Sequence, residues 1–247
     1  MDWIEPDWPA PSRVRALCTT RRGGVSAGTF ASLNLADQVG DEPSHVAQNR
    51  AQLHKRFGLP SEPYWLQQVH GCAVADAARE PEGCQADAAI AARPGAVCAV
   101  LTADCLPLLL CNGAGTHVAA VHAGWRGLAD GIIEAAVARL AVPPCEILCW
   151  LGPAIGPQVF EVGAEVRTRF LELGKEDTQT AFRPSPGGKW LADLYALAQE
   201  RLHRCGVDQV SGGGFCTYSD SERFFSYRRD GVTGRMASLI WIDPDAD

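Results

Sequence analysis

The sequence predicts an α+β fold, in which one layered domain over residues 1–247 packs helices on central mixed β-sheets. Three observations lead to this prediction. The chain has 247 residues, of which 47% are hydrophobic and 21% charged, which is near the upper limit of what one hydrophobic core organises. Strand-like and helix-like segments are mixed without the strict alternation of a Rossmann-type fold. No repeat, low-complexity tract or Ser/Gly linker divides the chain.

The N-terminal part is expected to contain a strand, a helix and a second strand. Residues 15–20 form an apolar run that ends before a Gly-Gly pair. Residues 41–57 begin with acidic residues and Pro, and Gly58 provides a stop, so we predict a helix. Residues 64–70 carry the aromatic and β-branched side chains that are typical of a strand.

The central and C-terminal parts alternate irregularly between the two element types. Apolar runs at residues 96–102, 106–111 and 116–122 predict three strands, the last two joined by a turn at residues 112–115. Apolar residues at helical spacing predict a helix over residues 128–140. The expected elements that follow are a strand at 146–151, a helix at 163–173, a Pro- and Gly-rich loop at 184–188, a helix at 191–205, a strand near Gln209, and a strand at 236–241.

Charge and composition exclude several classes of protein. A net charge of -7 disfavours a nucleic-acid-binding face, because such faces neutralise phosphates with Lys and Arg. No stretch reaches the about 18 to 20 consecutive apolar residues that a membrane helix needs. The acidic, Pro-containing start lacks the features of a signal peptide, so we expect a cytoplasmic protein. The ten cysteines are scattered and include no Cys-x-x-Cys pair, which argues against zinc fingers, thioredoxin motifs and a disulfide framework.

Residues 118–127 contain the most candidate functional residues of any segment. An apolar strand delivers His122 at its end, and a Gly-containing turn then leads into a helix. The small residues of the turn let a ligand approach the backbone, and the N-terminus of the helix favours anions. Arg126 lies four residues beyond His122, so we predict that its guanidinium binds an anion beside this site. The structural alternative is that Arg126 pairs with Asp104.

Two further strand ends bring potential partners for His122. Asp104 and Cys105 interrupt an apolar run, and a buried carboxylate is costly unless it is paired or ligated. His70 follows another strand-like segment. Two imidazoles and one thiolate form a zinc-type ligand set with an open fourth position. From the residues alone, a nucleophilic pair of Cys105 and His122 is an equal alternative.

Two Arg-rich segments at residues 19–26 and 224–235 also follow strand ends and precede Gly turns. Together with the turn after His122 they predict an anion-binding rim that includes Arg21, Arg228 and Arg229. The remaining histidines are interpreted as structural: His45, His54, His117 and His203.

These segments together resemble the YfiH family, also called the laccase-domain or multicopper polyphenol oxidase-like family, from about residue 15 to residue 241. The resemblance is carried by Thr19-Thr20-Arg21 with Gly23-Gly24-Val25-Ser26, Ser32-Leu33-Asn34-Leu35, Gln68-Val69-His70-Gly71, Ala103-Asp104-Cys105-Leu106-Pro107, His122-Ala123-Gly124-Trp125-Arg126-Gly127, Gly152-Pro153-Ala154-Ile155-Gly156 and Phe225-Ser226-Tyr227-Arg228-Arg229. The chain departs from the family pattern at Cys72 and Ala91, neither of which is a candidate ligand.

The resemblance implies helices flanking central sheets, an α/β/β/α-type sandwich, and a monomer or homodimer. It implies a zinc-type metal, with copper as the alternative, at His70, Cys105 and His122. It also implies phosphorolysis of adenosine, inosine and methylthioadenosine, with adenosine deaminase activity. The residues expected to act in catalysis are His70, Cys105, His122 and Arg126, and those expected to bind the substrate are Arg21, Asn34, Gln68, Asp104, Arg228 and Arg229.

Residue chemistry separates the activities associated with this family. A multicopper oxidase needs a His/Cys copper site and a three-copper cluster held mainly by further histidines. The chain has six histidines and no His-x-His pair, which disfavours a copper-dependent polyphenol oxidase. A three-ligand zinc suits adenosine deamination, and an arginine rim suits phosphorolysis. The expected partners are therefore a purine nucleoside and phosphate. The alternatives are a cysteine hydrolase that acts on cytoplasmic peptidoglycan precursors and a non-enzymatic metal-binding subunit.

Overall fold

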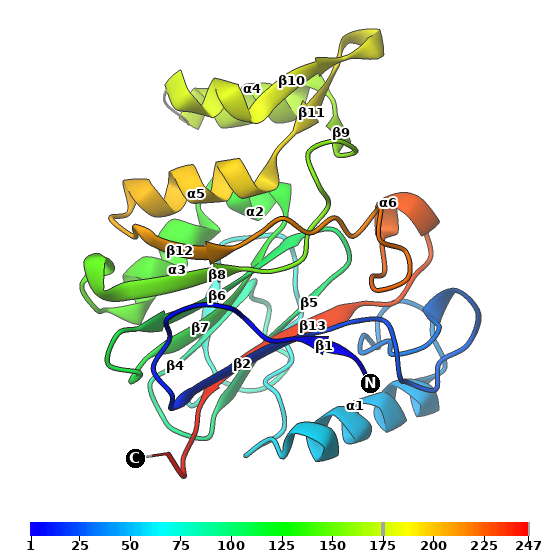
Figure 1. Ribbon diagram of the computed structural model, residues 1–247, viewed down its shortest axis with the longest axis vertical. Helices are drawn as coiled ribbons and strands as arrows, with labels where there is room; N and C mark the ends of the chain where they lie inside the picture. Colours follow the sequence, from blue (N-terminus) through cyan, green and yellow to red (C-terminus); the bar gives the residue numbers. More distant parts are fainter. Residues whose placement is uncertain (174–175, 247) are drawn as a thin grey trace.

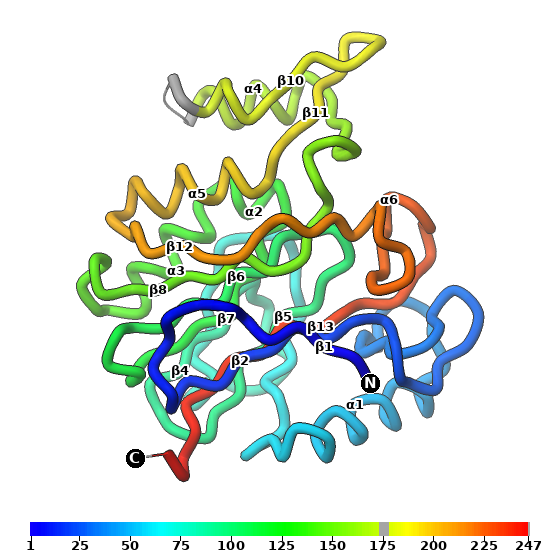
Figure 2. Tube along the Cα trace, in the orientation of Figure 1, coloured from blue at the N-terminus to red at the C-terminus, as the bar shows by residue number. Residues whose placement is uncertain are grey.

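Two β-sheets lie face to face at the centre of the computed structural model, which describes residues 1–173 and 176–246 (Figure 1). The four-stranded sheet is antiparallel throughout, because each of its neighbouring strands runs in the opposite direction. In spatial order it contains β1 (Trp3–Ile4), β2 (Val14–Thr19), β13 (Met236–Ile242) and β5 (Val97–Thr102). The two ends of the chain therefore pair within one sheet, as Figure 2 shows for its blue and red segments.

The six-stranded sheet is mixed. Its two outer pairs, β12 with β8 and β3 with β4, are parallel, whereas its inner pairs are antiparallel. Its spatial order is β12 (Gln209–Gly212), β8 (Ile147–Leu151), β6 (Leu106–Asn112), β7 (Val118–Ala123), β4 (Ala88–Ala91) and β3 (Val74–Asp76).

Strand alternation in β7 separates the two main parts of the core. Val118 and Ala120 pack in the cluster between the two sheets. Ala119 and Val121 pack in the cluster between the six-stranded sheet and the helices. His122 follows in the same alternation, which places its side chain on the face directed toward the other sheet.

Helices cover the outer faces of both sheets (Figure 1). Side chains of α2 (Trp125–Asp130), α3 (Ile132–Leu140) and α5 (Leu194–Arg204) pack in one core cluster with the six-stranded sheet. Leu53 of α1 (Pro43–Phe57) packs on the four-stranded sheet. The predicted α+β sandwich is therefore confirmed.

The remaining elements lie around this sandwich. They are α4 (Ala164–Leu173), α6 (Tyr227–Asp230), the antiparallel strands β9 (Glu161–Val162), β10 (Phe182–Ser185) and β11 (Lys189–Ala192), and the short 3-10 helices at Gly28–Phe30, Pro144–Glu146, Glu176–Ala181 and Pro186–Gly188. Among the described residues, no helix is both long enough and apolar enough to cross a membrane.

The prediction of a strand at residues 64–70 is wrong. The segment makes only isolated bridges, at Tyr64 and Gln67. The side-chain amide of Gln68, rather than its backbone, pairs with β5. Its Oε1 accepts from the Leu101 N–H at 2.8 Å, and its Nε2 donates to the Leu101 carbonyl at 2.9 Å. His70 then adopts φ +60°, which turns the chain away from β5.

Three other predicted boundaries also need correction. The helix predicted at residues 128–140 begins at Trp125 and divides at Gly131, whose φ of +107° ends α2. The predicted loop at residues 184–188 belongs to a hairpin of β10 and β11. The helix predicted from residue 191 begins at Leu194, because the Asp193 carboxylate accepts from two N–H groups of its first turn.

Candidate metal centre

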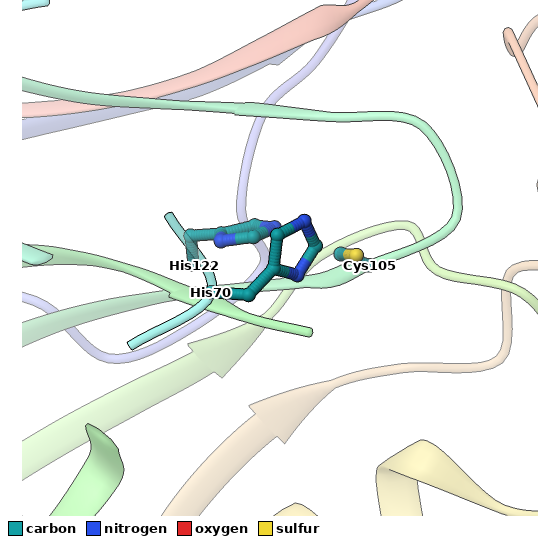
Figure 3. Close-up of side chains that lie close together, drawn as sticks. All are labelled: His70, Cys105 and His122. Atoms are coloured by element: carbon teal, nitrogen blue, oxygen red, sulfur yellow. The ribbon is translucent and has the colours of Figure 1, made fainter. Parts of the chain in front are cut away.

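Three potential metal donors meet at one point between the sheets and the loops that connect them (Figure 3). They are His70, Cys105 and His122, and their ligand atoms all lie within 4.8 Å of one another. The two imidazole rings meet edge to face, with centroids 4.8 Å apart and an interplanar angle of 74°. The structure thus brings together the three residues that the sequence analysis singled out.

Gly124 leaves the space that these donors occupy. A Cβ at this position would lie 2.6 Å from His70 Nδ1 and 3.1 Å from Cys105 Sγ. The backbone of Gly124 has φ -65° and ψ 156°, which any residue adopts, so the requirement for glycine is steric rather than conformational. The turn after β7 therefore packs directly against the donors.

The backbone is left-handed at one donor residue and at the residue that precedes another. His70 has φ +60° and Asp104, which precedes Cys105, has φ +89°. Left-handed conformations of non-glycine residues cost about 1 to 3 kcal/mol and persist only where the surroundings hold them, which is frequent at functional sites.

Asp104 is held from two distant segments. Its carboxylate accepts from Thr217 Oγ1 at 2.6 Å and from the Arg228 N–H at 2.7 Å. Its backbone carbonyl accepts from the Ile155 N–H at 2.9 Å. The expectation that this buried carboxylate needs partners is confirmed. The alternative that Asp104 pairs with Arg126 is wrong, since the ion pairs among the described residues include none between these two side chains and the Asp104 carboxylate bonds to Thr217 and Arg228 instead.

Asp87 is a buried carboxylate that the sequence analysis missed. Its Oδ1 lies 2.8 Å from His122 Nδ1, and its side chain is fully buried. Burial raises the pKa of Asp87, but hydrogen bonds from His122 and Gly71 outweigh burial, so the pKa is lowered. The signal that identified Asp104, an acidic residue within an apolar run, is also present at residues 86–91.

The two imidazoles have opposite electrostatic surroundings. Burial and the neighbouring His122 lower the pKa of His70, which favours the neutral form that binds metals. Burial also opposes charge on His122, but the Cys105 sulfur and the hydrogen bond to Asp87 outweigh it and raise the pKa of His122 to about 9. The surroundings therefore favour the neutral form of His70 and the charged form of His122.

The donor set fits a zinc-type ion. Two histidines and one cysteine, with a carboxylate behind one histidine, reproduce the pattern in which an outer acceptor fixes the orientation of a ligand. The close approach of Gly124 leaves the three donors room to face a common point.

The centre opens into a cavity of about 560 Å³, a volume within the range of small-molecule sites. Three arginines in its wall each lie over an aromatic ring that also lines it. The pairs are Arg126 over Trp125 at 4.5 Å, Arg228 over Phe160 at 5.2 Å, and Arg235 over Tyr227 at 5.9 Å.

The predicted substrate residues divide between the cavity wall and its support. Arg126, Arg228, Gln68 and Asp104 line the cavity, and so does Arg235, which the sequence analysis did not single out. Arg235 directly precedes β13, so the rule that polar residues at strand ends gather at sites would have identified it. The amide of Gln68, in contrast, is already bonded to Leu101.

Three other predicted substrate residues are not part of the cavity lining: Arg21, Asn34 and Arg229. The Arg21 side chain donates to the carbonyls of Ala31 and Ser221, and that of Arg229 donates to three carbonyls between residues 217 and 224. The Asn34 amide donates to the Ala36 carbonyl and to Asp41. These bonds hold the loops around the cavity, and direct substrate contact by these residues stays a prediction.

Known proteins resemble this chain over nearly its whole length. The family described as multi-copper polyphenol oxidoreductase laccase matches residues 15–243. Purine nucleoside phosphorylase PA4543 of Pseudomonas aeruginosa is 54% identical over 242 residues, covering 97% of this chain and 98% of that protein. Purine nucleoside phosphorylase YfiH of Escherichia coli K12 is 52% identical over 240 residues, with the same two shares.

A solved structure has the same fold. The crystal structure of Neisseria meningitidis protein NMB0706 superposes with a TM-score of 0.95 at 49% identity, covering 98% of this chain and 100% of that one. The family match spans nearly all of both central sheets and all three donors. The chain therefore belongs to the multi-copper polyphenol oxidoreductase laccase family, the YfiH family that its motifs resemble.

Proposed function

We propose that this protein is a zinc-dependent purine nucleoside enzyme, which phosphorolyses adenosine, inosine and methylthioadenosine and also deaminates adenosine. The observation that carries the proposal is the opening of a His/Cys/His centre into a cavity walled by three arginine–aromatic pairs. The names of the Pseudomonas and Escherichia relatives support the phosphorolytic activity.

His70, Cys105 and His122 would hold the metal. A zinc ion with three protein ligands supplies a Lewis acid that polarises an oxygen or lowers the pKa of a water molecule. Copper is the alternative ion, because imidazole and thiolate also suit it. Asp87 holds the His122 imidazole by its Nδ1 atom, so that the other ring nitrogen faces the remaining donors.

The arginines are suited to the phosphate. Phosphorolysis joins a phosphate oxygen to the anomeric carbon of the ribose while the bond from that carbon to the purine nitrogen breaks. The attacking dianion must be held beside the sugar, and guanidinium groups provide planar, charge-assisted hydrogen bonds for this purpose. Arg126, Arg228 and Arg235 are the guanidinium groups of the cavity wall.

The aromatic side chains are suited to the purine. Trp125, Phe160 and Tyr227 line the same cavity, and their flat faces offer apolar area to a heterocyclic base. Deamination of adenosine replaces the exocyclic amine by a water oxygen and releases ammonia, so it needs the base and the metal centre but no phosphate. One cavity therefore accommodates both reactions.

Purified protein incubated with inosine and phosphate, or with adenosine alone, tests the proposal. We expect hypoxanthine and ribose 1-phosphate in the first mixture and inosine in the second. Chromatography detects the purine products, and phosphorus NMR detects the sugar phosphate. Absence of metal-sensitive turnover in both mixtures would overturn the proposed function.

Arg126→Ala is expected to separate the two reactions. Loss of a charge-assisted hydrogen bond worth about 1.5 to 3 kcal/mol lowers kcat/KM for phosphorolysis by about 10- to 100-fold. Deamination falls less and metal content is unchanged. Arg126→Lys restores little if the contact is bidentate. Arg139→Ala, on an exposed part of α3, is the matched control. Equal loss of both reactions together with a lowered Tm would contradict a phosphate contact.

A cysteine hydrolase is the second candidate, and one observation favours it. The ligand atoms of Cys105 and His122 lie within 4.8 Å of one another, and His122 Nδ1 lies 2.8 Å from Asp87, so the three would serve as nucleophile, base and orienting carboxylate. Asp104, the other carboxylate considered for the orienting role, instead bonds to Thr217 and Arg228. His70 discriminates: His70→Ala removes a metal donor but no member of this triad. Hydrolysis of a peptidoglycan-precursor amide that survives His70→Ala would favour the hydrolase.

The residues do not favour a multicopper oxidase. Such an enzyme needs a three-copper cluster besides its His/Cys site. Within residues 1–173 and 176–246, one group of three or more metal-binding side chains comes together, the group at His70, Cys105 and His122. A single-metal centre is therefore the form that the chain's own donors support.

A further inference from the structure

We infer that Asp87 is a positioning residue that sets the orientation of two of the three metal donors at once, His70 and His122. The inference rests on the metal centre of the proposed function. It concerns a residue that lies behind the donors and does not itself belong to the three-donor group.

The Asp87 carboxylate connects two segments that are distant in the sequence. Its Oδ1 lies 2.8 Å from His122 Nδ1, at the end of β7, and accepts from the His70 N–H at 2.9 Å. Its Oδ2 accepts from the N–H groups of Gly71 at 2.7 Å and Val69 at 3.2 Å. Each oxygen therefore has two partners, and the side chain is fully buried.

The contact with His122 selects one state of the imidazole. An ionised carboxylate only accepts hydrogen bonds, so Nδ1 of His122 carries a proton and donates it to Asp87. The other ring nitrogen, Nε2, is then the one left for the metal. Hydrogen bonds of this kind fix both the tautomer and the rotation of a metal-binding histidine.

The contacts with residues 69–71 hold the backbone that carries the other imidazole. His70 adopts φ +60°, which is costly for a residue with a β-carbon. The three consecutive N–H groups that converge on Asp87 are ones that such a turn would otherwise leave without protein acceptors. Asp87 thereby stabilises the turn that directs the His70 ring toward Cys105.

Asp87 is itself firmly placed. Its carbonyl accepts from the His122 N–H at 2.7 Å, and its own N–H donates to the Ala73 carbonyl at 3.0 Å. Backbone and side chain therefore join the same two segments. A movement of either histidine away from the centre would break several of these bonds together.

Asp87→Asn tests the inference, because the amide keeps the shape of the side chain but replaces one acceptor oxygen by an NH2 group that faces N–H donors. Competition with a chromophoric chelator measures the zinc dissociation constant, which we expect to rise about 10- to 100-fold. In metal-free protein, we expect the downfield Nδ1–H resonance of His122, assigned by its absence in His122→Gln, to disappear.

Asn49→Ala is the matched control. Asn49 is fully buried, accepts from the Val25 N–H at 2.8 Å and donates to the Asn34 carbonyl at 2.8 Å, so its loss also removes buried hydrogen bonds. We expect it to lower Tm without changing the zinc dissociation constant. If Asp87→Asn does not fold, Asp87→Ser, which leaves room for water, is measured in the same way.

Two results would overturn the inference. One is a zinc dissociation constant for the Asp87 variant within about twofold of the parent value, or raised no more than in Asn49→Ala. The other is an unchanged His122 Nδ1–H resonance. If the parent protein binds no zinc, the proposed function fails, whereas the resonance still decides whether Asp87 orients His122.

Discussion

Replacing Cys105 by Ala is expected to remove both the bound metal and the nucleoside activities. Zinc falls from near one ion per chain to near zero, because two imidazoles without the thiolate hold the ion weakly and leave His122 without the sulfur that it faces. Since a catalytic metal supplies several kcal/mol of transition-state stabilisation, kcat/KM should fall by about 1000-fold or more. Elemental analysis and the inosine assay measure the two effects.

Cys72→Ala is the control for this substitution. Cys72 is a half-buried thiol two residues beyond His70, and its sulfur donates only a long hydrogen bond of 3.7 Å to the Gly127 carbonyl. We expect this variant to keep its zinc and its activity. Full zinc content in Cys105→Ala would show that the thiolate is not a ligand. A parent protein that is active without metal and inactive as Cys105→Ala would instead support the hydrolase.

Gly124→Ala is expected to have the second largest effect. The added Cβ would lie 2.6 Å from His70 Nδ1 and 3.1 Å from Cys105 Sγ, so at least one donor or the turn itself must move. Since displacement of a reacting group by about 1 Å costs on the order of 100-fold in rate, we expect kcat/KM to fall by about 100-fold or more. The zinc dissociation constant should rise at the same time.

Gly113→Ala separates this steric effect from the general cost of replacing a glycine. A Cβ at Gly113 would meet its nearest atom, the Glu146 carbonyl oxygen, at an ordinary 3.7 Å. Neither glycine has a left-handed φ, so neither variant places alanine in that strained conformation. Retention of tight zinc binding and activity in Gly124→Ala would contradict the arrangement of donors described above.

The three donors could be predicted because each follows an apolar segment, and polar residues at strand ends gather where sheets end. The prediction held for His70 even though its segment is not a strand, since the Gln68 side chain attaches it to β5 in place of a backbone ladder. Asp87 interrupts an apolar run as Asp104 does, so its position could have been noticed, but its role depends on four hydrogen bonds with residues 69–71 and 122. Sequence spacing contains no record of those contacts.

The direction of an arginine side chain also could not be predicted from its position in the sequence. Arg21, Arg229 and Arg235 all lie beside strand ends or tight turns, yet only Arg235 lines the cavity. Both Arg229 and Arg235 donate to backbone carbonyls, of residues 217, 218 and 224 and of residues 233 and 234 respectively, and the sequence does not reveal which of these loops borders the cavity. The short strands β9, β10 and β11 were missed because each has at most four residues, and Pro184 lies within β10.

Removal and return of the metal tests the central claim most directly. Protein is stripped by exhaustive chelation, its metal content is verified by elemental analysis, and hypoxanthine release from inosine and phosphate is followed before and after addition of one equivalent of zinc. We expect the rate to fall to background in the stripped protein and to return with zinc, because His70, Cys105 and His122 form the one group of three donors in the described chain. An undiminished rate in protein shown to be free of metal would contradict the account.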